Sequence, residues 1–313
     1  MMNKMKKIGL TALAASLVSV SAQAVDISGG QSLTYSNGND GVQGNPWSMN
    51  DSLTFSWGGE LDNGFTVDVS FLLDNSDGAA SQIFDNRSLA IGMGDAGTLK
   101  FWGQSGSGVV GSFDDRTPNA YEESWNSGDS PNQGHSASNM WYYTNSLDAV
   151  TLHASYAHGT VDASSTELGL VFTGIENVEL WAAAGTDNAA ANAVDNTIIG
   201  ASVKLGKATI GVQSNTADSE AANGDEDFLA WGVSYMVDED GNMSISYNSS
   251  TVDYETASTD DQEATGISAS YTMGSMTLAG VLNSIDNQGP GATGAGNTTS
   301  NNDMFEVNLS FAF

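Results

Sequence analysis

Acidic side chains gather in one long stretch of the chain, residues 105–137, which lacks the regular alternation found elsewhere. Its charged residues are Asp114, Asp115, Arg116, Glu122, Glu123 and Asp129. Carboxylates that line a narrow, water-filled passage raise the local concentration of cations and repel anions. The stretch therefore indicates ion selection. The alternative is a solvated external loop whose acids only keep the surface polar.

The histidines His135, His153 and His158 are the other residues that could carry chemistry. Histidine catalysis needs an acid, a base or a nucleophile held beside the ring, and no residue here is marked as a nucleophile. His153 and His158 differ in parity along one alternating stretch, so their side chains point to opposite faces and do not converge on a metal ion. The sequence therefore predicts no enzyme, no catalytic residue and no resident cofactor.

Two further acidic clusters lie in predicted loops. Their residues are Asp218, Glu220, Asp225, Glu226 and Asp227, and then Asp253, Glu255, Asp260, Asp261 and Glu263. Neither spacing matches the calcium loop of an EF-hand, which needs ligands at alternate positions and a bidentate Glu at the twelfth. We consider loosely bound divalent cations such as Ca²⁺ as a hypothesis, beside the alternative of a hydrated acidic surface.

The elements that must position these residues are strands, and the last stretch shows the pattern most clearly. From Phe305 to Phe313, apolar residues alternate with small or polar ones until the chain stops on an aromatic residue. Period two is typical of a strand with one apolar face and one polar face.

The same alternation runs through the chain from residue 25, and short turns alternate with longer connections. The predicted strands span residues 25–36, 50–60, 65–74, 86–94, 97–104, 138–146, 150–159, 164–173, 177–186, 194–205, 207–216, 226–237, 242–251, 262–273, 275–285 and 302–313. Bacterial transmembrane barrels have tight turns at one end and long loops at the other. We therefore expect an all-β, 16-stranded antiparallel transmembrane β-barrel, closed by pairing of the first and last strands.

The composition agrees with an exported barrel. Residues 1–24 form a predicted signal peptide, with a lysine-rich start, an apolar run and a small-residue cleavage site ending at Ala24. Residues 25–313 then form the barrel domain. The chain has 38 acidic and 8 basic residues, which argues against nucleic acid as a partner. It has no cysteine, so disulfides do not stabilise it.

Two hairpins and the final strand resemble the general diffusion porins of Gram-negative bacteria. Residues 57–71 are similar to the second porin hairpin, and residues 86–104 to the hairpin that leads into the constriction loop. Within the latter, Arg87, Gly92, Gly97 and Thr98 carry the likeness. The chain departs from the family in lacking a basic residue near Gln104.

The resemblance implies a third external loop, residues 105–137, folded into the lumen as a constriction. It implies that Asp114, Asp115, Glu122 and Glu123 face basic residues on the wall. By strand parity the inward candidates are Lys100 and Lys204, and Lys207, Arg87 and Arg116 are further candidates. This basic set is thinner than is usual in the family, which favours simple cation preference.

The resemblance also implies a place in the outer membrane and a set of partners. Phe313, Phe311 and Leu309 stand at the positions of the signal read by the barrel-assembly machinery. A homotrimer, contacts with outer-membrane lipid and lipopolysaccharide, and passive diffusion of small hydrophilic solutes and ions are expected. Two alternatives stay open: a substrate-selective channel with a saturable binding site, and a non-conducting structural or adhesive barrel.

Overall fold

The computed structural model describes residues 25–38, 45–74, 84–126, 128–159, 164–188, 192–255, 260–288 and 301–313. The predicted signal peptide, residues 1–24, lies outside the described residues.

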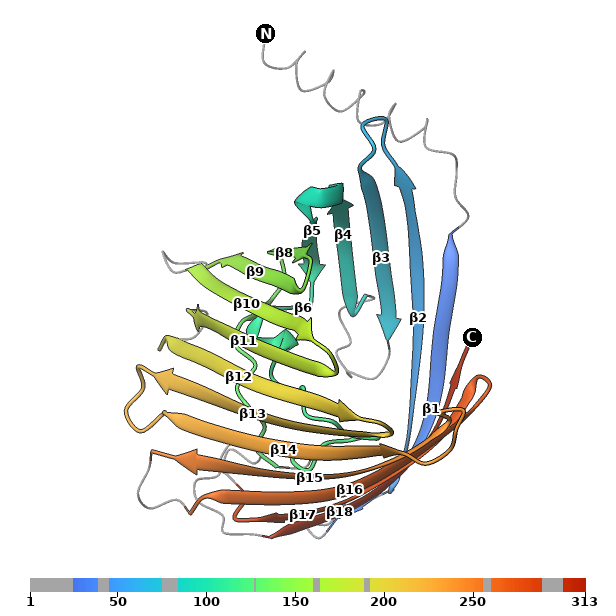
Figure 1. Cartoon of the computed structure of the whole chain (residues 1–313), viewed down its shortest axis with the longest axis vertical. Coiled ribbons are helices and arrows are strands. Elements are labelled where there is room, and N and C mark those ends of the chain that lie inside the picture. Colours follow the sequence, from blue (N-terminus) through green and yellow to red (C-terminus); the bar gives the residue numbers. More distant parts are fainter. Residues whose placement is uncertain are drawn as a thin grey trace.

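Sixteen strands of the described chain form one closed antiparallel barrel, in which each strand pairs with its neighbours in sequence. A further short pair, β6 with β7, lies apart from the barrel sheet. The first and last strands close the cylinder (Figure 1): Leu33 is opposite Leu309, and the backbone groups of Gly29 and Phe313 exchange two hydrogen bonds of 3.0 and 3.1 Å. Closure leaves no unpaired edge, as a strand-built membrane protein requires.

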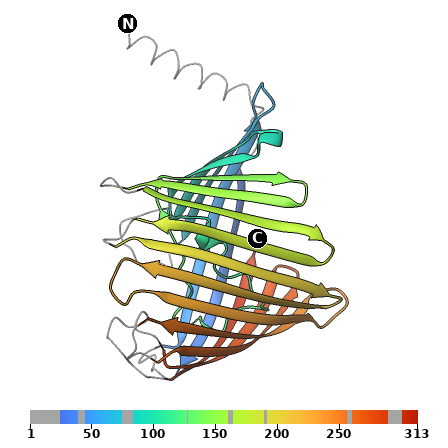
Figure 2. The same ribbon diagram turned by 60° about the vertical axis from the view of Figure 1, so that its left-hand side comes forward.

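The barrel strands are β1 (Asp26–Gly38), β2 (Trp47–Glu60), β3 (Thr66–Asp74), β4 (Asn86–Gly92), β5 (Thr98–Gln104), β8 (Met140–Leu147), β9 (Val150–His158), β10 (Ser164–Ile175), β11 (Val178–Asp187), β12 (Val194–Leu205), β13 (Ala208–Ser219), β14 (Glu226–Met236), β15 (Met243–Tyr254), β16 (Gln262–Met273), β17 (Met276–Asp286) and β18 (Asn302–Ala312). The short pair is β6 (Gly106–Ser107) and β7 (Ser136–Ala137), and the 3₁₀ turns are η1 (Gly94–Ala96) and η2 (Val110–Ser112). Figure 2 shows the later strands as successive tilted rungs of one wall.

Every predicted strand is present, so the sixteen-stranded antiparallel prediction is confirmed. The ranges 194–205 and 262–273 are reproduced at both ends, and other boundaries shift by a few residues. The short turns use the expected residues: Gly206 and Gly274 have φ of 63° and 62°, a left-handed conformation that glycine adopts without steric cost.

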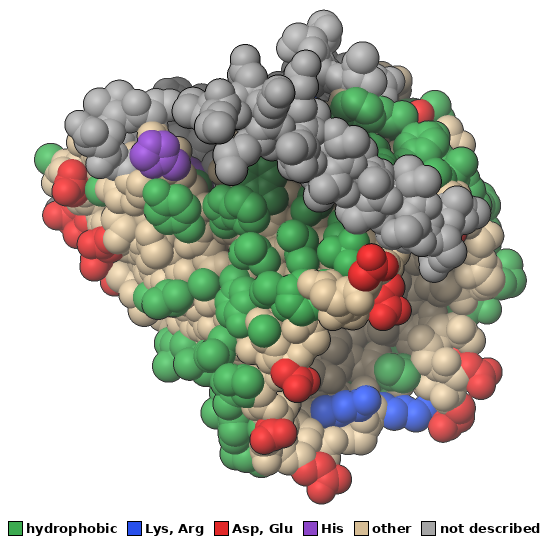
Figure 3. Space-filling view, turned by 90° about the horizontal axis from the view of Figure 1, so that it is seen from above, with side chains coloured by type: hydrophobic (Ala, Val, Ile, Leu, Met, Phe, Trp, Pro, Cys, Tyr) green, Lys and Arg blue, Asp and Glu red, His purple; other side chains and the backbone are tan. Residues whose placement is uncertain are grey.

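Alternation along each strand separates an outer apolar face from an inner face. On β16, for example, Ile267 is 57 % exposed whereas the neighbouring Ser268 is 1 % exposed. Figure 3 shows broad fields of hydrophobic side chains on the surface seen from above, with acidic side chains toward the margins and few basic ones. No helix within the described ranges is long and apolar enough to cross a membrane.

The buried core lies where one irregular segment meets the inner face of the wall. This segment, residues 105–139, connects β5 to β8 and is called the inner segment below. It carries β6, η2 and β7, and its contacts run from β9 to β18. Among the described residues its apolar side chains complete two buried clusters with the wall.

Candidate functional site

The first part of the inner segment is seated by apolar contacts. Val109, Val110 and Phe113 are at most 1 % exposed, and they form a cluster with wall residues that include Trp181 and Ile198. The wall residues stand at alternate positions of their strands and so share the inner face. Water is excluded from this contact, which fixes the entry of the segment into the barrel.

Inward polar side chains of the wall satisfy the backbone of the middle part. Gln213 on β13 accepts a hydrogen bond from the Arg116 amide at 3.1 Å and donates to the Asp114 carbonyl. Asn248 on β15 donates to the Pro118 carbonyl at 2.8 Å. Buried peptide groups without partners are costly, so these side chains allow an irregular chain to lie against the wall.

The far part of the segment has its own anchor. Trp125 is 5 % exposed and meets Phe228 of β14 edge to face, with ring centroids 5.0 Å apart. Gln262 on β16 accepts from the Asp129 amide at 2.8 Å and donates to its carbonyl at 2.9 Å. Tyr254 donates to the Asp129 carboxylate at 3.0 Å, so this acid is held by the wall.

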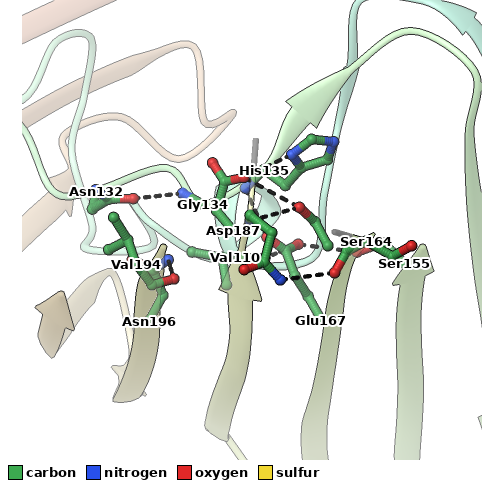
Figure 4. A network of polar contacts seen from close by, with 12 residues as sticks. Val110, Asn132, Gly134, His135, Ser155, Ser164, Glu167, Asp187, Val194 and Asn196 are labelled. Atoms are coloured by element: carbon green, nitrogen blue, oxygen red, sulfur yellow. Dashed lines mark hydrogen bonds and ion pairs between the residues drawn. The ribbon is translucent and has the colours of Figure 1, made fainter. Parts of the chain in front are cut away.

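The first and last parts of the inner segment, called its two stems below, meet at one buried carboxylate. This is the carboxylate of Glu167 on β10. Figure 4 shows this network: Glu167 accepts from the amides of Val110 at 3.0 Å and His135 at 2.8 Å, and Ser155 donates to it at 3.0 Å. The His135 ring pairs with Asp187 through a nitrogen–oxygen distance of 2.9 Å. The network ties the start and the end of the inner segment to the same place on the wall.

Three carboxylates form the acidic centre of the site: Glu122 and Glu123 of the inner segment, and Glu306 of β18. Tyr121 donates a 2.7 Å hydrogen bond to Glu306, and Asn119 donates to Glu123 at 2.6 Å. Burial, with the nearby charges of Glu123 and Glu306, raises the pKa of Glu122 to about 7. Like charges this close to one another disfavour ionisation, and burial likewise raises the pKa of Glu123 above its usual range.

The other two predicted acids of the segment, Asp114 and Asp115, differ in burial. Asp114 is 6 % exposed, and burial together with the charge of Asp115 raises its pKa to about 7. Asp115 itself is exposed. The charges of Asp115 and Glu123 act on each other, so the two acidic pairs of the segment form one electrostatic group.

The predicted basic residues are not gathered opposite these acids. Arg116 lies 3.4 Å from Glu179 and over the rings of Phe113 and Trp181. Lys100 lies 3.4 Å from the centroid of the Trp102 ring, which agrees with the inward face expected for it. Of the remaining candidates, Arg87 lies on β4 and Lys204 on β12.

Arg87 corrects one expectation from the sequence. It is exposed and stands opposite Phe71, whose ring packs against Trp57 on the outer face. A register shift between Arg87 and Ser88 interrupts the pairing of β4 with β5. Arg87 therefore shares the outward face of its strand and does not face the inner segment.

Lys204 has the inward parity expected from the sequence, but it is exposed and lies beside the short turn at Gly206. Its neighbour in that turn, Lys207, pairs with Glu239 at 2.7 Å. The structure therefore brings the four predicted acids together and leaves their basic counterparts dispersed.

The histidines and the other acidic clusters show no arrangement for chemistry. His153 contacts the ring of Phe113 on the inner face, whereas His158 lies within 3.4 Å of Tyr156 on the outer face, as parity predicted. Within the described ranges, no three His, Asp or Glu side chains lie close enough to hold a metal ion. The two further acidic clusters therefore give no structural support to the hypothesis of bound Ca²⁺.

Several wall residues that contact the inner segment escaped the sequence analysis: Glu167, Gln213, Asn248, Gln262 and Glu306. Their inward parity was readable from the alternation. Nothing in the sequence indicates which wall residue meets which part of a segment far away along the chain.

A model of a protein family, described as Gram-negative porin, matches residues 9–290 of the chain. The chain belongs to the Gram-negative porin family. Porins are channels rather than enzymes, and this porin is a β-barrel of the outer membrane that forms a passage for small solutes. The expectations of a porin and of a non-enzymatic protein are thereby confirmed.

Solved structures share the porin fold at low sequence identity. OmpT of Vibrio cholerae matches with a TM-score of 0.72 and 12 % identity, covering 94 % of this chain and 100 % of OmpT. An anion-selective porin from Comamonas acidovorans matches with a TM-score of 0.69 and 16 % identity, covering 93 % and 99 %. A variant porin of Rh. blastica gives 0.68 and 17 %, covering 93 % and 100 %. A sequence search among curated proteins gives no significant match.

Proposed function

We propose that the inner segment narrows the channel of this porin and gives it a preference for small hydrophilic cations. The observation that carries the proposal is the meeting of Glu122 and Glu123 with Glu306 of β18. Together with Asp114 and Asp115 they form an acidic group on the inner side of the barrel. Carboxylates that face a confined aqueous path lower the energy of cations there and raise that of anions.

The sparse basic residues support the same direction. Arg116 is the one basic residue of the inner segment, and Glu179 offsets its charge at 3.4 Å. Lys100 lies against the Trp102 ring, with Nζ 3.4 Å from the ring centroid. The Comamonas acidovorans relative is named as anion-selective, so the preference depends on the charges of each chain and has to be measured for this one.

The test is the zero-current potential of the refolded protein in a planar lipid bilayer under a KCl gradient. We expect stepwise conductance and a potential of the sign set by K⁺ permeation. A potential of the opposite sign would contradict the cation preference. A flux that saturates with solute concentration would point to a substrate-selective channel, and a lack of conductance to a structural barrel.

We further propose that this porin assembles as a homotrimer and contacts lipopolysaccharide with its outer face. One of the matching structures is named as the trimer form of OmpT, and large apolar side chains such as Leu168 and Leu282 are exposed. We also propose that Leu309, Phe311 and Phe313 act as the assembly signal. Cross-linking in outer-membrane fractions would reveal the trimer, and a Phe313→Ala variant should assemble more slowly.

A further inference from the structure

Glu167 is a buried acid that the ion preference does not use. It lies on β10 with 1 % of its surface exposed. One carboxylate oxygen accepts hydrogen bonds from the Val110 amide at 3.0 Å and from Ser155 Oγ at 3.0 Å, and the other accepts from the His135 amide at 2.8 Å. Val110 follows β6 and His135 precedes β7, so one side chain holds both stems of the inner segment (Figure 4).

The backbone around Glu167 is shaped to this carboxylate. A Cβ atom added at Gly108 would collide with Oε2 of Glu167, and one added at Gly134 would collide with Oε1. Gly134 has a φ of 60°, a conformation that also favours glycine. The chain therefore approaches the carboxylate from both stems as closely as a peptide can.

A second contact supports the same attachment from the next strand. The His135 ring lies 2.9 Å from the carboxylate of Asp187 at the end of β11. Ser165 of β10 donates to the same carboxylate at 3.2 Å. His135 is thus held through its backbone by Glu167 and through its side chain by Asp187.

We propose that Glu167 is the positioning residue that fixes the inner segment and thereby sets the aperture of the channel. The inference rests on the proposed narrowing of the channel by this segment. Hydrogen bonds to a carboxylate are stronger than those between neutral groups. A neutral amide at this position would turn one acceptor into a donor that faces a backbone N–H or the Ser155 hydroxyl, which opposes seating of the stems.

The decisive variant is Glu167→Gln, because it keeps the shape of the side chain and removes the charge. Its single-channel current is recorded in planar bilayers, with Glu176→Gln as the control. Glu176 lies exposed in a short turn and undergoes the same change of charge. Loss of a charge-assisted hydrogen bond shifts the equilibrium toward a released segment by roughly tenfold or more. We therefore expect the channel of Glu167→Gln to spend roughly tenfold more time at alternative conductance levels than the wild type. The Glu176→Gln control should behave as the wild type does.

A second, milder variant tests the same contact if Glu167→Gln does not assemble into a barrel. Ser155→Ala removes a donor to Glu167 and the acceptor of the Val109 amide at 3.1 Å. It should raise the same fluctuations to a lesser extent. The heat-induced unfolding of the barrel should change little in either assembled variant, since the barrel hydrogen bonds are untouched. A residue that only supports the fold would change the unfolding temperature and leave the open-channel current as it is.

Rescue by a covalent link would separate positioning from other effects. The chain has no cysteine, and a Cβ at Gly169 would lie 2.6 Å from Cγ1 of Val109, so the two positions are adjacent and can be linked by a pair of introduced cysteines. In Glu167→Gln carrying Val109→Cys and Gly169→Cys, the oxidised protein should regain a steady current and lose it again on reduction. A current of Glu167→Gln as steady as that of a conducting wild type would overturn the inference. A non-conducting wild type would instead overturn the proposed function.

Discussion

Tyr121 of the inner segment donates a 2.7 Å hydrogen bond to the Glu306 carboxylate on β18. This contact links the acidic pair Glu122–Glu123 to the strand that closes the barrel against β1. It therefore places a wall carboxylate within the electrostatic group of the segment. Burial and this hydrogen bond both raise the pKa of Tyr121, so the phenol remains a neutral donor.

Removing that donor should loosen the middle of the inner segment. A hydrogen bond to a charged group contributes about 1.5–3 kcal/mol, so Tyr121→Phe should speed amide exchange of residues 119–125 by roughly tenfold or more. Hydrogen exchange followed by mass spectrometry measures this. Tyr143→Phe is the matched control, because its hydroxyl bonds to the Ala96 carbonyl at a short turn. Equal exchange in both variants would show that the Tyr121 contact does not hold the segment.

Cation preference should depend on pH near neutrality. The pKa values of Asp114 and Glu122 are raised to about 7. Each carboxyl is neutral below its pKa and negative above it, so the zero-current potential should move toward zero as the pH falls through about 7. An Asp114→Asn, Glu122→Gln variant should lose most of this change. A potential that is constant across this range would contradict ionisable acids at the narrow point.

The same raised pKa values should make the folded inner segment more stable at low pH, whereas the cation preference should be stronger at high pH. The native state binds protons more tightly than the unfolded chain at these two acids, because their unfolded pKa values lie near ~4. Their contribution is therefore fully present below the unfolded pKa of ~4 and is lost as the pH rises from there through about 7. As the pH rises through this range, the inner segment of the wild type should become less resistant to protease. The decline should be smaller in the Asp114→Asn, Glu122→Gln variant.

Trp125 should anchor the far part of the inner segment. Replacing a buried aromatic residue by alanine costs about 3–5 kcal/mol, and the loss here falls on the contact with Phe228. Trp125→Ala should expose the segment to protease while the barrel stays folded, as limited digestion and gel mobility would show. Trp141→Ala provides the control, because Trp141 is 43 % exposed and contacts Phe101 on the outer face.

Arg116 and Arg87 should differ in their effect on ion selectivity. Arg116→Ala removes the positive charge beside the acids, so the zero-current potential should move further toward that of K⁺. Its partly exposed pair with Glu179 contributes at most about 1 kcal/mol to folding, and the unfolding temperature should hardly change. Arg87→Ala should leave the selectivity unaltered, because Arg87 stands on the outward face opposite Phe71. A larger change with Arg87→Ala would mean that our assignment of its face is wrong.

The sequence predicted the strands well because alternation reports directly on the two faces of a barrel wall. The range 194–205 was correct at both ends, and the inward parity of Lys100 and His153 agrees with their contacts. Arg87 was included as a further candidate although its place on β4, two residues before Leu89, already gives it the parity of the outward apolar face.

The path of the inner segment lay beyond what the sequence could give. The acids from Asp114 to Glu123 were identified as a group, but the wall residues that hold this stretch lie more than a hundred residues away along the chain, such as Asn248 on β15 and Glu306 on β18. Glu167 looked like any inward polar residue of a strand. Its role arises from two stems that meet it only after the chain has folded.

The most direct test of the account asks whether the acids of the inner segment, rather than the total charge, set the ion preference. Glu122→Gln, Glu123→Gln and Glu306→Gln are combined in one variant. The control is Asp218→Asn, Glu220→Gln and Asp225→Asn, which removes as many charges from the end of β13 and the connection that follows it, outside the inner segment. Zero-current potentials under the same KCl gradient should fall for the first variant and stay near that of the wild type for the second. Equal falls in both would show that diffuse surface charge, and not the inner segment, selects the ions.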